Sequence, residues 1–386
     1  MSLQKRNQYL ERIEFSFSVN PVVALLGPRQ CGKTTLARSY IKLEQTHKIH
    51  YFDLEDPEDF ALFENPKLIL APLKGLIVID EIQRVPEIFQ LIRVLVDSDL
   101  KDKQFLILGS ASRDLIHQSS ETLAGRISYI EITPFSFHEV QDISQLWLRG
   151  GFPKSYLAHS LEQSVEWRKE YISTFLERDV PNLGFDIPAQ SLRRFWVMMT
   201  SYHGNIFNAS EIGRSMGLSG VTMRRYLDLL TGTFMLRQLQ PWYENITKRQ
   251  VKSPKIYFRD SGIFHTLLGI NKKQEIIRHT KLGASWEGYA LESIIRFHRA
   301  PKEECFFWAI HQQAEIDLML ILDGKRVGFE FKWADAPKLT KSIVTASELL
   351  KLDRCYIVYP GEKSYPIRED VLAIGLEKYL KEARNK

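Results

Sequence analysis

The residues best suited to chemistry in this sequence lie in a short glycine-rich segment, GPRQCGKTT, near the N-terminus. It fits the pattern G-x-x-x-x-G-K-[ST] with Gly27, Gly32, Lys33 and Thr34. Glycines allow backbone amides to curl around phosphates, and the start of a following helix adds positive charge. We expect Lys33 to reach the β- and γ-phosphates of a nucleotide. The Thr34 hydroxyl would bind magnesium, and Thr35 completes the expected binding loop.

Two acidic residues follow an apolar run in the segment GLIVIDEIQRVP. Residues 76–79 predict a buried parallel strand, which places Asp80 and Glu81 at its carboxyl end, where open α/β sheets bind ligands. Asp80 is positioned to hold the magnesium shell, and Glu81 to polarise the water that attacks the γ-phosphate. In QFLILGS, a further predicted strand ends at Ser110, whose hydroxyl is placed to sense the γ-phosphate.

Phosphoryl transfer also needs an arginine that stabilises charge in the transition state. Arg126 in ETLAGRISYIE is the first candidate and Arg178 in FLERDV is the second, although a structural ion pair explains either of them equally well. Cys31 lies inside the glycine-rich segment. A small residue that fits a variable loop position explains it better than a redox-sensitive thiol does. The expected cofactors are therefore ATP and Mg²⁺.

The elements that position these residues follow from length and pattern. The chain has 386 residues, 44% of them hydrophobic and 26% charged, which indicates a globular protein of two or three domains. We expect an α/β fold class with three parts: a parallel-sheet nucleotide-binding domain, a mostly helical middle, and a compact C-terminal α/β domain. The predicted boundaries are 1–140, 141–275 and 276–386.

Several classes of protein are disfavoured by the same sequence. No apolar run is long enough to cross a bilayer, and the charged start MSLQKRNQYLERIEF lacks the core of a signal peptide. The three cysteines show no metal-binding spacing and no disulfide framework. We therefore expect a cytoplasmic protein without a membrane partner, and an oligomer stays possible.

The middle of the chain carries most of the positive charge. Residues 141–280 contain 19 basic and 12 acidic residues, a net charge of +7, against −3 in 1–140 and +1 in 281–386. This distribution favours a polyanion partner, although a solvated surface also explains it.

Residues 208–242 have the sequence pattern of a winged helix-turn-helix. We expect Ser210 to cap a first helix and 217–219 to form the turn. The alternation in TFMLRQLQPW suggests a two-stranded wing. The second helix, at about 220–231, is expected to bury Val221, Tyr226, Leu227 and Leu230 and to expose Thr222, Arg224 and Arg225. Arg224 and Arg225 are the candidate DNA contacts, but winged helices also bind proteins, so both kinds of partner stay open.

A hairpin is predicted near the C-terminus by EIDLMLILDGKRVGFEFKW, because Asp-Gly favours a two-residue turn. If Leu322 pairs with Lys325, the same register brings opposed carboxylates together on one face. In that register Asp317 faces Glu330 and Glu315 faces Lys332, while Ile316, Leu318, Leu320, Phe329 and Phe331 form the apolar face.

Opposed carboxylates repel each other, and a divalent cation would remove the repulsion. Asp317 followed by Glu330 and Lys332, with Glu287 on a preceding helix, resembles the PD-(D/E)xK nuclease core. The resemblance implies a metal site at Asp317 and Glu330. It leaves open whether the fold keeps its catalysis, and no proline precedes Asp317.

Over most of its length the chain resembles a prokaryotic family of AAA-superfamily ATP-binding proteins. The matching stretches are GPRQCGKTT, VIDEIQRVP, GSAS, AGR, RGGFP, FLERDV, SWEGYALE, EIDLML and FEFK. The resemblance implies ATP binding through Gly32, Lys33 and Thr34. It also implies a winged helix between the ATPase domain and the nuclease-like domain.

Three functions compete at this point. One is a DNA-processing enzyme in which ATP drives the winged helix and the nuclease-like core onto DNA. Another is a nucleotide-gated switch or adaptor that binds protein partners and carries an inactive nuclease fold. The last is a small-molecule kinase, which is the weakest of the three because the sequence shows no acceptor pocket.

Overall fold

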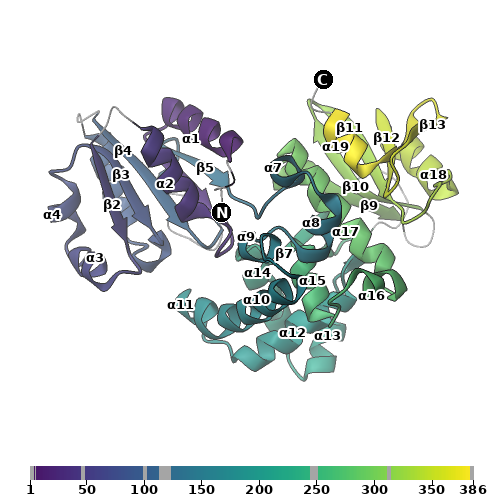
Figure 1. Ribbon diagram of the computed structural model, residues 1–386, viewed down its shortest axis with the longest axis horizontal. Coiled ribbons are helices and arrows are strands. Elements are labelled where there is room, and N and C mark those ends of the chain that lie inside the picture. The colour runs from purple at the N-terminus through teal and green to yellow at the C-terminus, as the bar shows by residue number, and fades with distance from the viewer. Residues whose placement is uncertain are drawn as a thin grey trace. The chain divides into compact units, whose positions relative to one another are not determined.

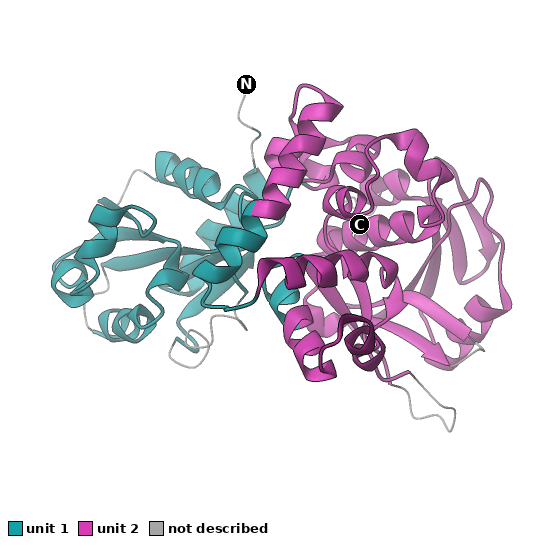
Figure 2. Ribbon diagram, turned by 90° about the horizontal axis from the view of Figure 1, so that it is seen from below, with its two compact units in different colours: residues 1–135, 174–187, 228–235 teal, residues 136–173, 188–227, 236–386 magenta. Residues whose placement is uncertain are grey.

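The computed structural model describes residues 4, 6–44, 48–98, 102–112, 123–243, 251–310 and 314–382. These residues form two compact units that alternate along the chain (Figure 2). Unit 1 contains residues 1–135, 174–187 and 228–235, and unit 2 contains residues 136–173, 188–227 and 236–386.

Unit 1 is built on a parallel five-stranded sheet with the order β2-β3-β4-β1-β5 (Figure 1). The strands are β1 (Val22–Leu26), β2 (Ile49–Asp53), β3 (Gly75–Asp80), β4 (Lys103–Gly109) and β5 (Ile127–Glu131). Because every pairing is parallel, the carboxyl ends of all five strands lie at one edge of the sheet. The helical segments of this unit are α1 (Asn7–Val19), α2 (Lys33–Leu43), α3 (Pro57–Leu62), α4 (Pro66–Leu70), η1 (Ile82–Arg84), α5 (Ile88–Asp97), η2 (Phe175–Asp179) and α11 (Val180–Asn182).

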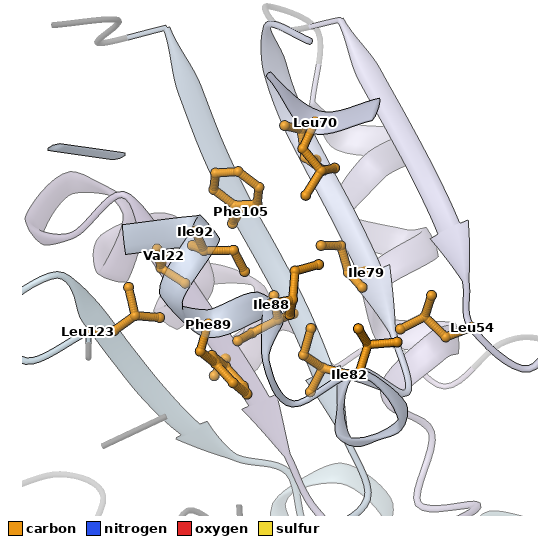
Figure 3. Packing of buried hydrophobic residues seen from close by; sticks show 14 of the residues in the cluster. Val22, Leu54, Leu70, Ile79, Ile82, Ile88, Phe89, Ile92, Phe105 and Leu123 are labelled. Atoms are coloured by element: carbon orange, nitrogen blue, oxygen red, sulfur yellow. The ribbon is translucent and has the colours of Figure 1, made fainter. Parts of the chain in front are cut away.

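Both faces of this sheet are buried, which explains why its strands read as continuous apolar runs. Alternate residues of each strand point to opposite faces. On one face Ile77 and Ile79 belong to a cluster with Ile88 and Ile92 of α5. Figure 3 shows Ile79, Ile88 and Ile92 within this cluster. On the other face, Val78 belongs to the cluster that includes residues of α1 and α2. The predicted α/β nucleotide-binding architecture is confirmed.

Unit 2 contains strands ordered β13-β14-β12-β11-β10-β9-β7-β8-β6. They are β6 (Asn205–Ile206), β7 (Leu236–Pro241), β8 (Lys255–Phe258), β9 (Cys305–Ile310), β10 (Ala314–Leu322), β11 (Lys325–Phe331), β12 (Arg354–Tyr359), β13 (Ser364–Arg368) and β14 (Val371–Gly375). Its helices are α7 (Phe137–Val140), α8 (Ile143–Arg149), α9 (Pro153–Tyr156), α10 (Leu161–Thr174), α12 (Ala189–Ser201), α13 (Ala209–Met216), α14 (Gly220–Gly232, whose last residues are in unit 1), α15 (Ser261–Leu267), α16 (Lys273–Arg278), α17 (Leu282–His298), η3 (Lys302–Glu304), α18 (Lys341–Leu350) and α19 (Leu376–Glu382).

The middle of unit 2 follows the order α12, β6, α13, α14, β7 and β8, and β8 pairs antiparallel with both β6 and β7. The turn at Gly217 is left-handed, with φ of +70°, and α14 begins at Gly220. Three details of the sequence prediction are wrong. Asn208 rather than Ser210 caps α13, because its side chain accepts the Glu211 amide. Val221 is 76% exposed, and the run TFMLRQLQPW supplies only one strand, β7, whose antiparallel partner is β8 rather than a neighbour within the run.

The C-terminal hairpin has the predicted register, since Leu322 pairs with Lys325 and Leu318 pairs with Phe329. The predicted alternation of faces fails farther along β10. Its register against β9 shifts between Ile316 and Met319, and both of these residues join one buried cluster with Trp308. A β-bulge adds one residue on one strand and therefore breaks the period of two that the prediction assumed.

A buried polar chain in unit 2 joins three separate segments. The indole N–H of Trp147 donates to the Ser285 hydroxyl at 2.9 Å, and that hydroxyl lies 2.7 Å from Nε2 of His265. Nδ1 of His265 is 3.3 Å from the Leu148 carbonyl oxygen. Burial lowers the pKa of His265 to about 3, so the imidazole is neutral in the folded protein.

This histidine makes unit 2 sensitive to acid. Because the folded pKa is below the unfolded value of 6.5, its contribution is present above pH 6.5 and is lost as pH falls toward 3. We expect the free energy of unfolding to fall by about 1.4 kcal/mol per pH unit more in wild type than in His265→Gln. All seven tryptophans lie in unit 2, so urea unfolding followed by tryptophan fluorescence measures this unit. Equal slopes between pH 7 and 5 would contradict the assignment.

Candidate functional site

The glycine-rich loop connects β1 to α2 at the carboxyl edge of the unit 1 sheet. Two of its glycines are sterically required. Gly32 has φ of +99°, and a Cβ on Gly27 would lie 2.1 Å from the Ile132 carbonyl oxygen. The helix α2 begins at Lys33 with no side-chain cap, so amides of its first turn are available to a phosphate.

The side chains after the loop are arranged as a nucleotide site requires. The buried Lys33 ammonium donates to the Gly27 and Pro28 carbonyl oxygens at 2.9 and 3.0 Å, so it lies across the loop itself. The Thr34 hydroxyl donates to Oδ2 of Asp80 at 2.8 Å, whereas the neighbouring Thr35 is exposed. The two predicted magnesium ligands are therefore already in contact.

Asp80 is held at the end of β3 by more than Thr34. The Tyr51 hydroxyl, on the adjacent strand β2, donates to the same Oδ2 at 2.9 Å. The Glu81 amide donates to Oδ1 at 2.9 Å. Burial raises the pKa of Asp80, although the Thr34 hydrogen bond opposes this effect. A bound cation would favour the charged form. Sequence reasoning missed Tyr51, because nothing in the local pattern marks it.

Glu81 has a left-handed backbone, with φ of +56°, which is uncommon for a residue other than glycine. Its carboxylate oxygen Oε2 accepts hydrogen bonds from the Gln83 amide and, at 3.2 Å, from the Ser110 hydroxyl. Ser110 directly follows β4, and Gln83 also donates to its hydroxyl at 2.9 Å. The structure therefore brings together Lys33, Thr34, Asp80, Glu81 and Ser110, which the sequence separates by as many as 77 positions (110 − 33).

Arg29 is a site residue that the sequence prediction did not include. Its guanidinium lies 2.6 Å from Oδ1 of Asp179 and 3.6 Å from Oε2 of Glu81, and it also pairs with Glu55. Burial alone would lower the pKa of Arg29, but these three carboxylates raise it above its ordinary value. Its position inside the glycine-rich loop was the sequence feature that could have identified Arg29 as a site residue.

The first arginine candidate is placed elsewhere. Arg126 directly precedes β5, which runs parallel to β1 with Val22 opposite Ile127, so Arg126 lies at the amino edge of the sheet. Its side chain pairs with Asp97. This corrects the expectation that Arg126 acts within the chain's own site. Arg178 lies nearer to it, since its guanidinium is 3.4 Å from Glu55, but the side chain is 58% exposed.

Cys31 is fully buried inside the loop, and its thiol is 3.5 Å from the Ile132 carbonyl oxygen. Burial raises the pKa of this thiol, which disfavours the reactive thiolate. A packing role therefore fits this residue better than a redox role.

The unit 1 donors fit a magnesium ion bound together with a nucleotide. Magnesium prefers one or two protein oxygens and completes its shell with waters and phosphate oxygens. Thr34 and Asp80 are oxygen donors in contact with each other at the start of α2. With the phosphates, they would supply the protein part of such a shell.

The acidic residues of unit 2 form a second cluster, but a lysine supplies its positive charge. Lys255 on β8 is 3% exposed. Its ammonium pairs with Glu315 and lies 3.4 Å from Oδ1 of Asp317. The other Asp317 oxygen accepts the Phe331 amide at 3.1 Å. Both oxygens of the best candidate metal ligand are therefore engaged by the protein.

The other predicted members also have protein partners. The Tyr257 hydroxyl donates to Oε1 of Glu287 at 2.6 Å, and the Lys332 ammonium is 2.6 Å from Oε1 of Glu330. Oε2 of Glu330 is buried and has no hydrogen-bond partner among the residues that the structure describes. Burial and the nearby Asp317 raise the pKa of both Glu287 and Glu330, which favours their protonated forms.

These contacts do not fit the second metal site that the sequence suggests. Within the described ranges, no group of three or more His, Cys, Asp or Glu side chains is arranged to hold a metal ion. As predicted, Glu287 lies on a helix that precedes the hairpin: α17 begins at Leu282 and carries Glu287 in its second turn. The site at Asp317 and Glu330 stays a prediction that the geometry does not favour.

Comparison with known proteins identifies the family. A family model described as AAA domain matches residues 19–141, and two domains of unknown function, DUF8612 and DUF4143, match residues 140–274 and 282–379. The uncharacterized protein Rv2008c of Mycobacterium tuberculosis is 45% identical over 380 residues, which cover 98% of this chain and 85% of the relative. Mb2031c of Mycobacterium bovis gives the same values. This chain belongs to their family.

This family member is an AAA-type, ATPase-like nucleotide-binding protein. Among solved structures, the Walker-type ATPase PABY2304 of Pyrococcus abyssi aligns with 69% of this chain and 96% of its own, at 16% identity and a TM-score of 0.48. A single-residue variant of RuvB of Thermotoga maritima aligns with 61% of this chain and 89% of its own chain, at 18% identity and a TM-score of 0.30. Both scores are below 0.5, so the assignment rests on the family match and the sheet.

No helix in the described part of this AAA-type protein has both the length and the apolar character needed to cross a bilayer.

Proposed function

We propose that this protein is a magnesium-dependent ATPase that couples its nucleotide state to unit 2. The contact between Thr34 and Asp80 beside Lys33 carries this proposal, because it places magnesium ligands and a phosphate-binding lysine around one loop. Glu81 at the end of the same strand supports hydrolysis, since it is placed to polarise a water. Ser110 hydrogen-bonds to that carboxylate.

Calorimetry on the full chain tests the first step of this proposal. We expect ATP with magnesium to bind to wild type, and Lys33→Ala to weaken binding, because the mutation removes the lysine that contacts the phosphates. Lys74→Ala is a matched control, since Lys74 is a surface lysine paired with Asp102 in the same unit. Absence of binding heat with both ATP and GTP, on well-folded protein, would overturn the proposal.

For unit 2, the observations favour a nucleotide-gated switch or adaptor over an active nuclease. Lys255 pairs with both Glu315 and Asp317, so an ammonium of the protein already offsets part of their negative charge without a metal. DNA binding and protein binding both remain part of the proposal, because Arg224 and Arg225 are exposed on α14. A cytoplasmic location is proposed as well, since Cys31, Cys305 and Cys355 are free thiols.

A cleavage assay separates these possibilities. We expect no magnesium-dependent cleavage of plasmid or single-stranded DNA, with or without ATP. Cleavage that is lost in Glu330→Ala and retained in Glu348→Ala, a matched change at an exposed residue of α18, would establish the nuclease instead.

Salt dependence tests DNA contact at α14. If Arg224 and Arg225 contact phosphates, each Arg→Ala change should reduce the slope of log K against log salt concentration by about 1. Unchanged slopes in both variants, or no DNA binding by wild type, would leave protein partners as the proposed targets of this surface.

A further inference from the structure

Arg29 links three carboxylates that come from different parts of unit 1. Glu55 follows β2, Glu81 follows β3, and Asp179 ends the π-helical turn η2. The guanidinium is 15% exposed and the Asp179 side chain 5% exposed, so solvent screens their 2.6 Å contact only weakly. Arginine suits this position because its planar fork carries several donors in fixed directions.

The contact with Glu81 concerns the residue placed to polarise water. Oε2 of Glu81 accepts hydrogen bonds from the Ser110 hydroxyl and the Gln83 side-chain amide. The Arg29 guanidinium lies 3.6 Å from the same oxygen. The Glu81 backbone is left-handed, so its side-chain direction depends on such contacts rather than on regular strand geometry. Arg29 therefore contributes to where this carboxylate points.

The contact with Asp179 concerns the chain segment 174–187. This segment belongs to unit 1, while the residues before and after it in the chain belong to unit 2. Its turn η2 is π-helical, an irregularity that occurs often at functional sites. Burial raises the pKa of Asp179 and Arg29 opposes this rise, so Arg29 favours the charged carboxylate there.

We propose that Arg29 is a positioning residue: it holds the Glu81 carboxylate for hydrolysis and ties the nucleotide-binding loop to segment 174–187 through Asp179. The hydrolytic half of this inference rests on the proposed ATPase function. Because Arg29 lies between Pro28 and Gln30 in the loop that would contact phosphates, nucleotide binding and release act directly on this tie. The segment is continuous in sequence with unit 2 at both ends, which gives a covalent route for coupling.

Kinetics test the effect through Glu81. We expect Arg29→Met to lower kcat by about tenfold or more and to change the Kd for ATP with magnesium less than about threefold. In a Glu81→Gln background the same change should cost less than about twofold, because the two residues act together. Arg29→Lys keeps the positive charge but lacks the planar guanidinium, so it should give an intermediate loss of kcat. This variant replaces Arg29→Met in the test if Arg29→Met does not fold.

Arg93→Met is the matched control, since Arg93 is a half-exposed arginine paired with Asp97 in unit 1, and it should leave kcat unchanged. Wild-type kcat in both Arg29 variants would overturn the positioning role. So would a tenfold loss that persists in the Glu81→Gln background. A selective loss of ATP affinity would instead make Arg29 a phosphate-binding residue.

Hydrogen exchange tests the tie to Asp179 without any turnover. In the nucleotide-free full chain, Arg29→Met and Asp179→Asn should both speed amide exchange within 174–187 relative to wild type, and Asp102→Asn, a change at an exposed surface aspartate, should not. Unchanged exchange in both variants would overturn the tie. If wild type shows no ATP turnover, the proposed ATPase function and the proposed positioning of Glu81 both fail. The hydrogen-exchange result still decides whether Arg29 is tied to segment 174–187 through Asp179.

Discussion

Replacing Glu81 with Gln is expected to lower ATP turnover about 10²- to 10⁴-fold, the range that a positioned general base contributes. The Kd for ATP with magnesium should stay within about threefold of wild type, because Lys33, Thr34 and Asp80 are unchanged. The amide keeps the size of the side chain and its contacts with Gln83 and Ser110. What it loses is the charge that would attract a proton from water.

Single-turnover measurements with magnesium give the rate of the chemical step. Glu87→Gln is a control, because Glu87 precedes α5 in the same unit and has no assigned part in the site. Unchanged hydrolysis by Glu81→Gln would remove this residue from the mechanism. Comparable losses of turnover and affinity would instead mean that the site itself was distorted.

Replacing Lys255 with Met is expected to destabilise unit 2 by about 3–5 kcal/mol, the cost of leaving a buried charge without its partner. Lys255 pairs with both Asp317 and Glu315, and its ammonium also lies 5.5 Å from the centre of the Phe307 ring. Methionine keeps a similar shape and removes the charge. Burial alone would lower the pKa of Lys255, but Asp317 and Glu287 raise it, so these acids favour the charged ammonium.

Urea unfolding followed by tryptophan fluorescence measures this loss, since all seven tryptophans lie in unit 2. Lys332→Met is the matched control. Its side chain is 42% exposed, so its loss should cost well under half as much. Equal effects of the two mutations would contradict a special role for Lys255. A large rise in wild-type stability on adding magnesium alone would favour the metal site over the lysine.

The sequence by itself determined the features that depend on local spacing. The positions of Gly32, Lys33 and Thr34 follow from a loop that must let backbone amides reach phosphates before a helix begins. An apolar run followed by Asp80 identifies a strand end in the same way. The register at Leu322 and Lys325 follows from a two-residue Asp-Gly turn, which involves only neighbouring residues.

Only the tertiary structure decided which charges meet across long separations. Arg29 and Asp179 are 150 positions apart, and Lys255 and Asp317 are 62 apart, so no local pattern relates them. The structure also placed Arg126 at the sheet edge away from the nucleotide-binding loop, because β5 begins there and runs parallel to β1. Ion pairs depend on distance in space and on burial, and both are set by how the sheets and helices pack.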